Sequence, residues 1–284
     1  MEPLSSLTRA QASAVRTLAD AARAADGVAP LNEEAHLQLE RTGALHWLAT
    51  EGEDVVGYAQ WQPTNATGQL VVHPDHRRRG HGTSLWAALR SDVADPASWA
   101  FGDLHGAQRF AAAQGLVPAR GLHIMGRDLT AETEVRQPAE GVRLRSFTPA
   151  DEDAFLAVNA AAFAGHPEQG HFSADDFANR RAEAWWDPDG LILAEDSDGV
   201  VGFHWTKRHD ATTGEVYVLG VDPRGAGRGL GGLLLDAGLA HLGNGGATRV
   251  ILYVDAGNTP AVALYERSGF AVVHTDTLYR PAAG

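Results

Sequence analysis

The sequence contains no cysteine and a single lysine among its 284 residues. Without cysteine there is no disulfide, no thiolate zinc ligand and no cysteine nucleophile. No run of about 18 apolar residues occurs, which excludes a transmembrane helix. The first four residues, MEPL, lack the basic-then-apolar pattern of a signal peptide. We therefore expect a cytoplasmic protein that does not bind membranes.

Positive charge is also scarce, since the formal net charge is −13. Such a surface repels nucleic acid, and no basic helix-turn-helix is present, so we expect no nucleic-acid partner. An anionic ligand must be held by a local site that acts against the overall field. Hydrophobic residues make up 44% of the chain, enough for folded cores, and the length suits two domains better than one.

An internal repeat divides the chain into two similar halves. Residues 70–85 (LVVHPDHRRRGHGTSL) align without gaps with residues 219–234 (LGVDPRGAGRGLGGLL). Upstream of each segment lie two apolar runs joined by an acidic, glycine-containing turn, at 51–54 and 196–199, which indicates a β-hairpin. Each half therefore predicts the order helix, hairpin, strand, glycine-rich loop, helix, strand, helix, strand.

The repeat predicts an α/β protein with two tandem domains, each a central, mostly antiparallel mixed sheet flanked by helices. The first domain is expected over residues 1–130, a polar linker over 131–141 and the second domain over 142–284. Gly115 and Gly269 are typical of a helix C-terminus that leads into a final strand.

The glycine-rich segment of each half predicts an anion site at a helix N-terminus. Glycines allow positive φ, and successive backbone N–H groups bind phosphate with help from the helix dipole. Neighbouring arginines can add charge-assisted hydrogen bonds. One such turn can exist without a ligand, but two in-register copies favour a pyrophosphate. No Walker A motif occurs, and the glycine spacing disfavours a dinucleotide fingerprint.

Two motifs resemble those of the GCN5-related N-acetyltransferases. Residues 77–82 (RRRGHG) resemble the pyrophosphate loop of that family, and residues 258–270 (NTPAVALYERSGF) resemble its Asn-Ala-Tyr-Gly-Phe helix. Ala226 departs from the usual Gln or Arg, which removes a side-chain contact and leaves the backbone N–H groups. The resemblance implies acetyl-CoA as cosubstrate, up to one molecule per domain, and no metal.

The acetyl-CoA contacts implied by the resemblance lie in three segments. In the first half they are Leu70, Val71, Val72, Arg78, Arg79, Gly80, His81, Gly82 and Thr83. In the second half they are Leu219, Gly220, Val221, Ala226, Gly227, Arg228, Gly229, Leu230, Gly231, Gly232, Asn258, Thr259, Pro260, Ala261, Val262 and Ala263.

Further strings resemble the mycothiol synthase family within that superfamily, among them AFAGHPEQG at 162–170, GFHWTK at 202–207 and GEVYVLGV at 214–221. This resemblance implies acetylation of the cysteinyl amine of cysteinyl-glucosaminyl-inositol, which gives mycothiol. We expect a monomer acting on a small-molecule amine. The substrate-binding residues that the resemblance implies are Glu33, Glu168, Lys207, Glu215 and Tyr253.

Candidate proton-handling residues lie in the second half only. Glu215 lies near the start of a predicted strand and can accept the amine proton, directly or through water. Tyr265, expected on a helix face away from the apolar core, can protonate the leaving CoA thiolate. At the matched positions the first half has Ala66 and Ala111. We therefore expect catalysis in the second domain and a non-catalytic first domain that keeps a cofactor loop.

Other readings of the same residues stay open. Another cationic amine, such as an aminoglycoside or a peptide N-terminus, suits the same acidic groups. A non-catalytic acetyl-CoA-sensing module would bind without turnover. From pattern alone, Glu33 also fits a helix N-terminal acid, Lys207 a solvated cation and Tyr253 a core residue. Glu215 also fits a solvated carboxylate at a strand end, and Tyr265 a core aromatic with its hydroxyl at the surface.

Overall fold

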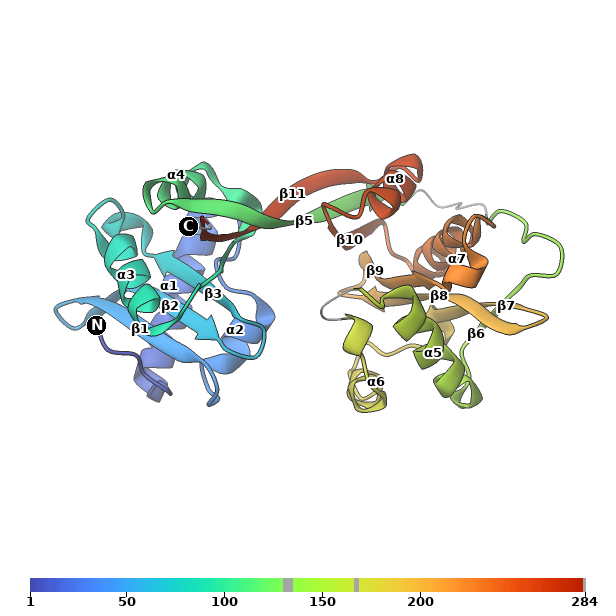
Figure 1. Ribbon diagram of the computed structural model, residues 1–284, viewed down its shortest axis with the longest axis horizontal. Coiled ribbons are helices and arrows are strands. Elements are labelled where there is room, and N and C mark those ends of the chain that lie inside the picture. The colour runs from blue at the N-terminus through green and yellow to red at the C-terminus, as the bar shows by residue number, and fades with distance from the viewer. Residues whose placement is uncertain (130–134, 166–168, 283–284) are drawn as a thin grey trace. The chain divides into compact units, whose positions relative to one another are not determined.

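The computed structural model describes residues 1–129, 135–165 and 169–282, in two compact units. Unit 1 comprises Met1–His123, Asp255–Gly257 and His274–Gly284, and unit 2 comprises Ile124–Val254 and Asn258–Val273. The long strands β5 (Leu116–Asp128) and β11 (Ala271–Pro281) therefore contribute residues to both units (Figure 1). The expected domain limits, 1–130 and 142–284, remain a prediction.

Unit 1 follows the predicted order of helices and strands, with a second helix before the hairpin. Its elements are α1 (Arg9–Asp26), α2 (Glu33–Gln38), β1 (Leu45–Glu51), β2 (Asp54–Gln62), β3 (Thr67–Val72), α3 (His81–Asp92), β4 (Ser98–Ala100) and α4 (His105–Ala113), followed by β5. Strands β1, β2 and β3 pair antiparallel in that order, β3 pairs parallel with β4, and β4 pairs antiparallel with β11. The sheet is thus mixed and mostly antiparallel, as predicted.

Strand β2 is buried along most of its length because helices cover both of its faces. Tyr58 packs in the cluster formed by α1, whereas the next residue, Ala59, packs in the cluster formed by α3. Thr8 caps the start of helix α1, where Thr8 and Gln11 exchange hydrogen bonds between side chain and backbone N–H, and Gly27, with a φ of 75°, caps its end. These local signals set the helix that covers one face of the sheet.

Unit 2 repeats the arrangement. Its elements are β6 (Arg143–Ser146), α5 (Glu152–Ala162), α6 (Ala174–Arg181), β7 (Leu191–Asp196), β8 (Gly199–Arg208), β9 (Thr213–Val221), α7 (Leu230–Asn244), β10 (Arg249–Asp255) and α8 (Thr259–Arg267), followed by β11. Strands β6 to β9 pair antiparallel in sequence order, and β9 pairs parallel with β10. Figure 1 shows α5 and α7 on opposite sides of these strands.

Strand β8 forms the centre of the core of unit 2. Trp205, fully buried, makes edge-to-face contacts with Phe155 of α5 and Phe177 of α6. On the other face Val201 packs with Leu234 of α7. Within the predicted linker, residues 131–134 lie outside the described part of the chain.

His204 on β8 predicts acid sensitivity of the fold. Its Nδ1 lies 2.8 Å from the carbonyl oxygen of Leu234, and complete burial lowers its pKa to about 4. The unfolded chain takes up this proton near pH 6.5 whereas the folded chain does not. The free energy of unfolding is therefore expected to fall by about 3 kcal/mol between about pH 6.5 and pH 4 from this residue.

Urea titrations across that pH range measure the effect. The His204→Gln variant, which has no titrating group and keeps a donor for the Leu234 carbonyl, should show a shallower decline of stability with acid. An equally steep decline in this variant would contradict the assignment.

Candidate functional site

The two glycine-rich loops adopt the same backbone conformation. Left-handed residues occur at matched positions, Arg78 (φ 63°) and Gly227 (φ 76°), and again at Gly80 (φ 92°) and Gly229 (φ 74°). Gly80 and Gly229 are the N-caps of α3 and α7, and no described side chain caps either helix at that residue. The first N–H groups of both helices are therefore not capped by a side chain at this residue, and the anion site remains a prediction.

In each unit a carboxylate at the hairpin turn forms an ion pair with an arginine of the glycine-rich loop. In unit 1, Glu51 pairs with Arg79 at 3.3 Å, and at the matched position of unit 2, Asp196 pairs with Arg228 at 2.6 Å. The hydrogen bond from Arg228 lowers the pKa of Asp196. Both arginines had been expected to contact phosphate, but in the structure they hold carboxylates. The backbone N–H groups are thus the first candidates for phosphate binding.

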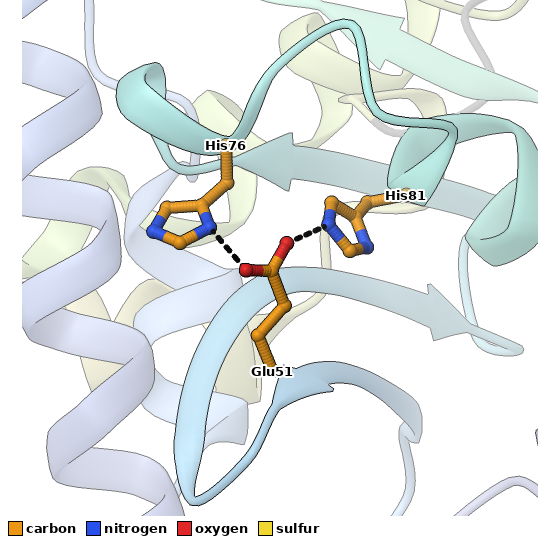
Figure 2. Close-up of side chains that lie close together, drawn as sticks. All are labelled: Glu51, His76 and His81. Atoms are coloured by element: carbon orange, nitrogen blue, oxygen red, sulfur yellow. Dashed lines mark hydrogen bonds and ion pairs between the residues drawn. The ribbon is translucent and has the colours of Figure 1, made fainter.

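Unit 1 adds two histidines to this contact (Figure 2). His81 Nε2 lies 2.8 Å from Glu51 Oε1, and His76 Nδ1 lies 3.2 Å from Glu51 Oε2. Ligand atoms of these three residues lie within 4.8 Å of one another, which suits a metal ion geometrically. Arg79 already neutralises the carboxylate, however, and unit 2 keeps the arginine–carboxylate pair without either histidine. We interpret the cluster as a set of hydrogen bonds and ion pairs that fixes the loop against the end of β1. The expected absence of a metal remains a prediction.

A cavity of about 750 Å³ lies beside the loop of unit 1. Strands β3 and β4 pair only at Gly68–Ser98 and Gln69–Trp99, after which β3 continues to Val72. The predicted contact residues that line the cavity are Leu70, Val71, Val72, Arg78, Gly80, His81, Gly82 and Thr83. Aromatic side chains, including Phe101 and Phe110, form the rest of the wall. Its size and its position beside the glycine-rich loop fit an extended ligand such as acetyl-CoA.

In unit 2 the parallel strands also separate. The pairing of β9 with β10 ends at Val216 and Leu252, although β9 continues to Val221. A β-bulge at Tyr217 lies at this point, and the register of β9 with β8 shifts there. Residues 219–221, expected to contact acetyl-CoA, pair with β8 on one side and have no strand partner in the described register on the other. Its backbone can therefore hydrogen-bond to a ligand.

The bulge changes which residue of unit 1 corresponds to Glu215. In the regular β2–β3 ladder Gln62 pairs with Thr67, whereas in the bulged ladder Lys207 pairs with Glu215. Since Gln62 and Lys207 hold matched positions in the repeat, the counterpart of Glu215 is Thr67. The expectation of Ala66 was wrong by one residue, because β9 contains one extra residue. A threonine hydroxyl is not a base at neutral pH, so unit 1 still lacks this function.

Glu215 is a buried carboxylate paired with a histidine. Its side chain is 7% exposed, and its Oε2 lies 2.6 Å from Nε2 of His209. Sequence reasoning missed His209. The signal that could have revealed it is the hairpin turn between β8 and β9. In this turn the His209 backbone N–H donates to the Thr213 carbonyl at 3.0 Å, which brings residues 209 and 215 close together.

Lys207 lies over two aromatic rings beside this pair. Its Nζ is 4.9 Å from the ring centre of Trp185 and 5.4 Å from that of Tyr217. A groove of about 540 Å³ is lined by these and neighbouring residues: Ala184, Trp185, Lys207, Arg208, His209 and Asp210. The cation–π contacts hold the ammonium at the wall of an open groove, which suits recognition of a polar ligand.

Tyr265 is buried, whereas an outward-facing position had been expected. It is 7% exposed, and its ring packs edge-to-face on Phe270 with centres 5.8 Å apart. The expectation failed because this face of the short helix α8 packs into the core that contains Leu252. Burial raises the pKa of Tyr265 to about 12, so the phenol stays protonated at neutral pH and can act as a proton donor. The matched residue of α4 is Ala111, as predicted.

Comparison with known proteins assigns the family. The Acetyltransferase (GNAT) family matches residues 160–270, and an Acetyltransferase (GNAT) domain matches residues 42–115. A mycothiol acetyltransferase from Thermobispora bispora is 48% identical over 94% of this chain and 95% of its own length. Another from Streptomyces avermitilis is 45% identical over 99% of this chain and 94% of its own length.

This chain belongs to the mycothiol acetyltransferase family. The predicted resemblance is thereby confirmed, and the protein is an N-acetyltransferase of the GNAT class.

Solved structures support the same fold for this mycothiol acetyltransferase family member. A GCN5-related N-acetyltransferase from Sphaerobacter thermophilus gives a TM-score of 0.75 at 25% identity, covering 97% of this chain and 93% of that one. A tandem GNAT protein from the clavulanic acid biosynthesis pathway gives 0.72 at 21% identity, covering 100% and 98%. The predicted tandem GNAT architecture is confirmed. In the described residues, no helix combines the length and apolar character needed to cross a membrane.

The other substrate residues implied by the family resemblance lie in different environments. Tyr253 is 50% exposed between the buried residues Leu252 and Val254, so its interpretation as a core residue was wrong. Alternation along β10 points it away from the core that holds its neighbours. Glu33 is the first residue of α2 in unit 1. Glu168 lies outside the described residues.

Helix α8 begins with the amide predicted to contact acetyl-CoA. Asn258 is its N-cap and accepts the N–H of Ala261 at 3.2 Å, and Thr259 and Pro260 beside it are exposed. At the matched N-cap of α4 stands Leu104, which has no side-chain acceptor. The first half therefore has no counterpart of the Asn258 side chain at this position.

The second loop predicts a glycine-specific effect on cosubstrate use. Gly229 has a φ of 74°, so the Gly229→Ala variant should lose about 1 kcal/mol of stability and misdirect the N–H groups of α7. Its KM for acetyl-CoA is expected to rise about tenfold in initial-rate assays. Gly141, with a φ of 78° outside the loop, is the matched control: Gly141→Ala should carry similar strain with an unchanged KM.

Proposed function

We propose that this protein transfers the acetyl group of acetyl-CoA to the cysteinyl amine of cysteinyl-glucosaminyl-inositol and so forms mycothiol, with the chemistry in unit 2. The observation that carries the proposal is the pairing of a buried carboxylate, Glu215 on β9, with a buried phenol, Tyr265 on α8, near the point where β9 and β10 separate. The matched positions of unit 1 hold Thr67 and Ala111. The acceptor is supported by relatives that are named mycothiol acetyltransferases.

The amine must lose a proton before it can attack. Glu215 is an acceptor-only group when ionised, and its burial keeps bulk water from competing for the substrate ammonium. The nitrogen lone pair then attacks the thioester carbonyl carbon. This role makes Glu215 the general base of the proposed reaction.

Breaking the C–S bond needs polarisation of the carbonyl and a proton for sulfur. Backbone N–H groups of β9 beyond Val216 can hydrogen-bond to the thioester oxygen, where negative charge develops. The Tyr265 phenol is protonated before the reaction because burial raises its pKa to about 12. It is therefore available to give its proton to the thiolate as the C–S bond breaks. The products are the amide and CoA thiol.

Acetyl-CoA binding is proposed at both loops and catalysis at one. The loop at residues 226–232, with Asn258 and the following residues to 263, would hold the cosubstrate in unit 2. The unit 1 loop and its cavity of about 750 Å³ can bind a second molecule. Thr67 and Ala111 supply neither base nor acid there, so unit 1 is proposed to be non-catalytic.

The acceptor is proposed to be held by polar groups outside the reacting centre. Lys207 at the groove and the exposed Tyr253 offer donors to sugar and inositol hydroxyls. Glu33 and Glu168 are proposed contacts on the strength of the family alone. We also propose that the protein acts as a cytoplasmic monomer, since both proposed substrates are small metabolites, and sedimentation analysis would test that state.

The decisive experiment measures CoA release by the full-length protein with a panel of amines. Cysteinyl-glucosaminyl-inositol should give the highest kcat/KM, and mass spectrometry should show one acetyl group on the cysteinyl nitrogen. A preference for an aminoglycoside or a peptide N-terminus would replace the acceptor. Tight acetyl-CoA binding without turnover on any amine would favour the sensing module instead.

A further inference from the structure

The proposed base is largely shielded from solvent. The Glu215 side chain is 7% exposed, and among the described residues its carboxylate has one hydrogen-bond partner, His209. The His209 side chain is 36% exposed and lines the open groove of about 540 Å³. The imidazole therefore stands between a buried carboxylate and water.

We propose that His209 is a positioning and proton-relay residue that carries the substrate proton from Glu215 to solvent. This inference rests on the proposed role of Glu215 as base. A base that is protonated in every turnover must lose that proton before the next one. Imidazole is the side chain best suited to accept and release a proton near neutral pH.

The relay balances without any co-reactant. At rest the Nε2–H of His209 donates to the Glu215 carboxylate. The ammonium gives its proton to this carboxylate, the imidazole ring then turns so that its unprotonated nitrogen faces the resulting acid, and that nitrogen takes the proton. The imidazolium releases a proton from its other nitrogen to water in the groove, which restores the ionised carboxylate and its N–H donor, and no electrons move in the sequence.

The charged groups around His209 are compatible with this route. Lys207 pairs with Glu215 across the ladder, and Arg208 directs its guanidinium to the Ala211 carbonyl at 3.0 Å. Asp210 accepts hydrogen bonds from Thr212, which lower its pKa to about 2, so it keeps its negative charge beside the turn. Two carboxylates, Glu215 and Asp210, and two cations, Lys207 and Arg208, thus belong to this turn and its strands. Their charges cancel, so no net positive charge opposes formation of the imidazolium.

The test compares His209→Gln and His209→Ala in the full-length protein. Glutamine can still donate a hydrogen bond to Glu215 but cannot relay a proton, whereas alanine does neither and leaves room for free imidazole. We expect both variants to lower kcat about 10- to 100-fold with little change in either KM, and added imidazole to restore part of the activity of His209→Ala. The same imidazole should not restore Glu215→Gln.

Control experiments distinguish a failure of the proton relay from a failure of the proposed function. His105→Gln is the same exchange on an exposed histidine of α4 in unit 1 and should leave kcat unchanged. The relay is overturned if His209→Gln keeps wild-type kcat, or if imidazole fails to raise the activity of a folded His209→Ala. If wild-type protein instead shows no CoA release with the proposed acceptor, it is the proposed function that fails.

Discussion

Replacing Glu215 with glutamine is expected to lower kcat by about 100- to 10,000-fold, because glutamine keeps the shape of the side chain and cannot take a proton. The Glu215 side chain is nearly fully buried, so water is a poor substitute for it as base. KM for acetyl-CoA should change little, since the cosubstrate loop is elsewhere in unit 2. Steady-state CoA release with a fixed amine measures both constants.

A matched control removes the same charge at a neutral site. Glu140, exposed in the segment before β6, should tolerate Glu140→Gln with unchanged kcat. Near-wild-type turnover of the Glu215→Gln variant at saturating amine would contradict the assignment of the base. A comparable loss in both variants would indicate a general effect of net charge.

Replacing Tyr265 with phenylalanine is expected to lower kcat by about 10- to 1,000-fold while stability stays within about 1 kcal/mol of wild type. The ring still packs on Phe270, and no described group hydrogen-bonds to the phenol, so the change removes the hydroxyl group and its proton without breaking a described contact. Thermal unfolding and steady-state kinetics on the same preparation separate the two effects.

The leaving group supplies the sharper control for Tyr265. A thiol that is more acidic than CoA needs less protonation as it departs, so acetyl thioesters of such thiols should show a smaller loss in Tyr265→Phe. An equal loss with every leaving thiol would assign Tyr265 to packing or binding and not to proton donation.

Much of the fold could be read from local signals. The hairpins follow from glycine-containing turns between apolar runs, and the loops from glycines that adopt positive φ at matched positions. The offset between α4 and α8 is constant, so Ala111 was correctly matched to Tyr265. Each of these features depends on a few neighbouring residues, and the internal repeat supplied a second copy of most of them.

The errors arose where burial or strand register decided the outcome. One extra residue at Tyr217 moved the counterpart of Glu215 from Ala66 to Thr67, and a gapless alignment cannot detect a bulge. Tyr265 is buried and Tyr253 is half-exposed, opposite to the pattern-based expectation for each. Which face of a short helix or strand is covered depends on the elements that pack there.

The sequence by itself determined the tandem repeat, the two glycine-rich loops and the family, because these rest on glycine conformations, turns and motif strings that are local in the chain. Only the tertiary structure decided that His209 meets Glu215, that β9 separates from β10 after Val216 and that residues 274–282 belong to unit 1. Those outcomes depend on hydrogen bonds and packing between segments brought together by folding, and no single segment encodes them.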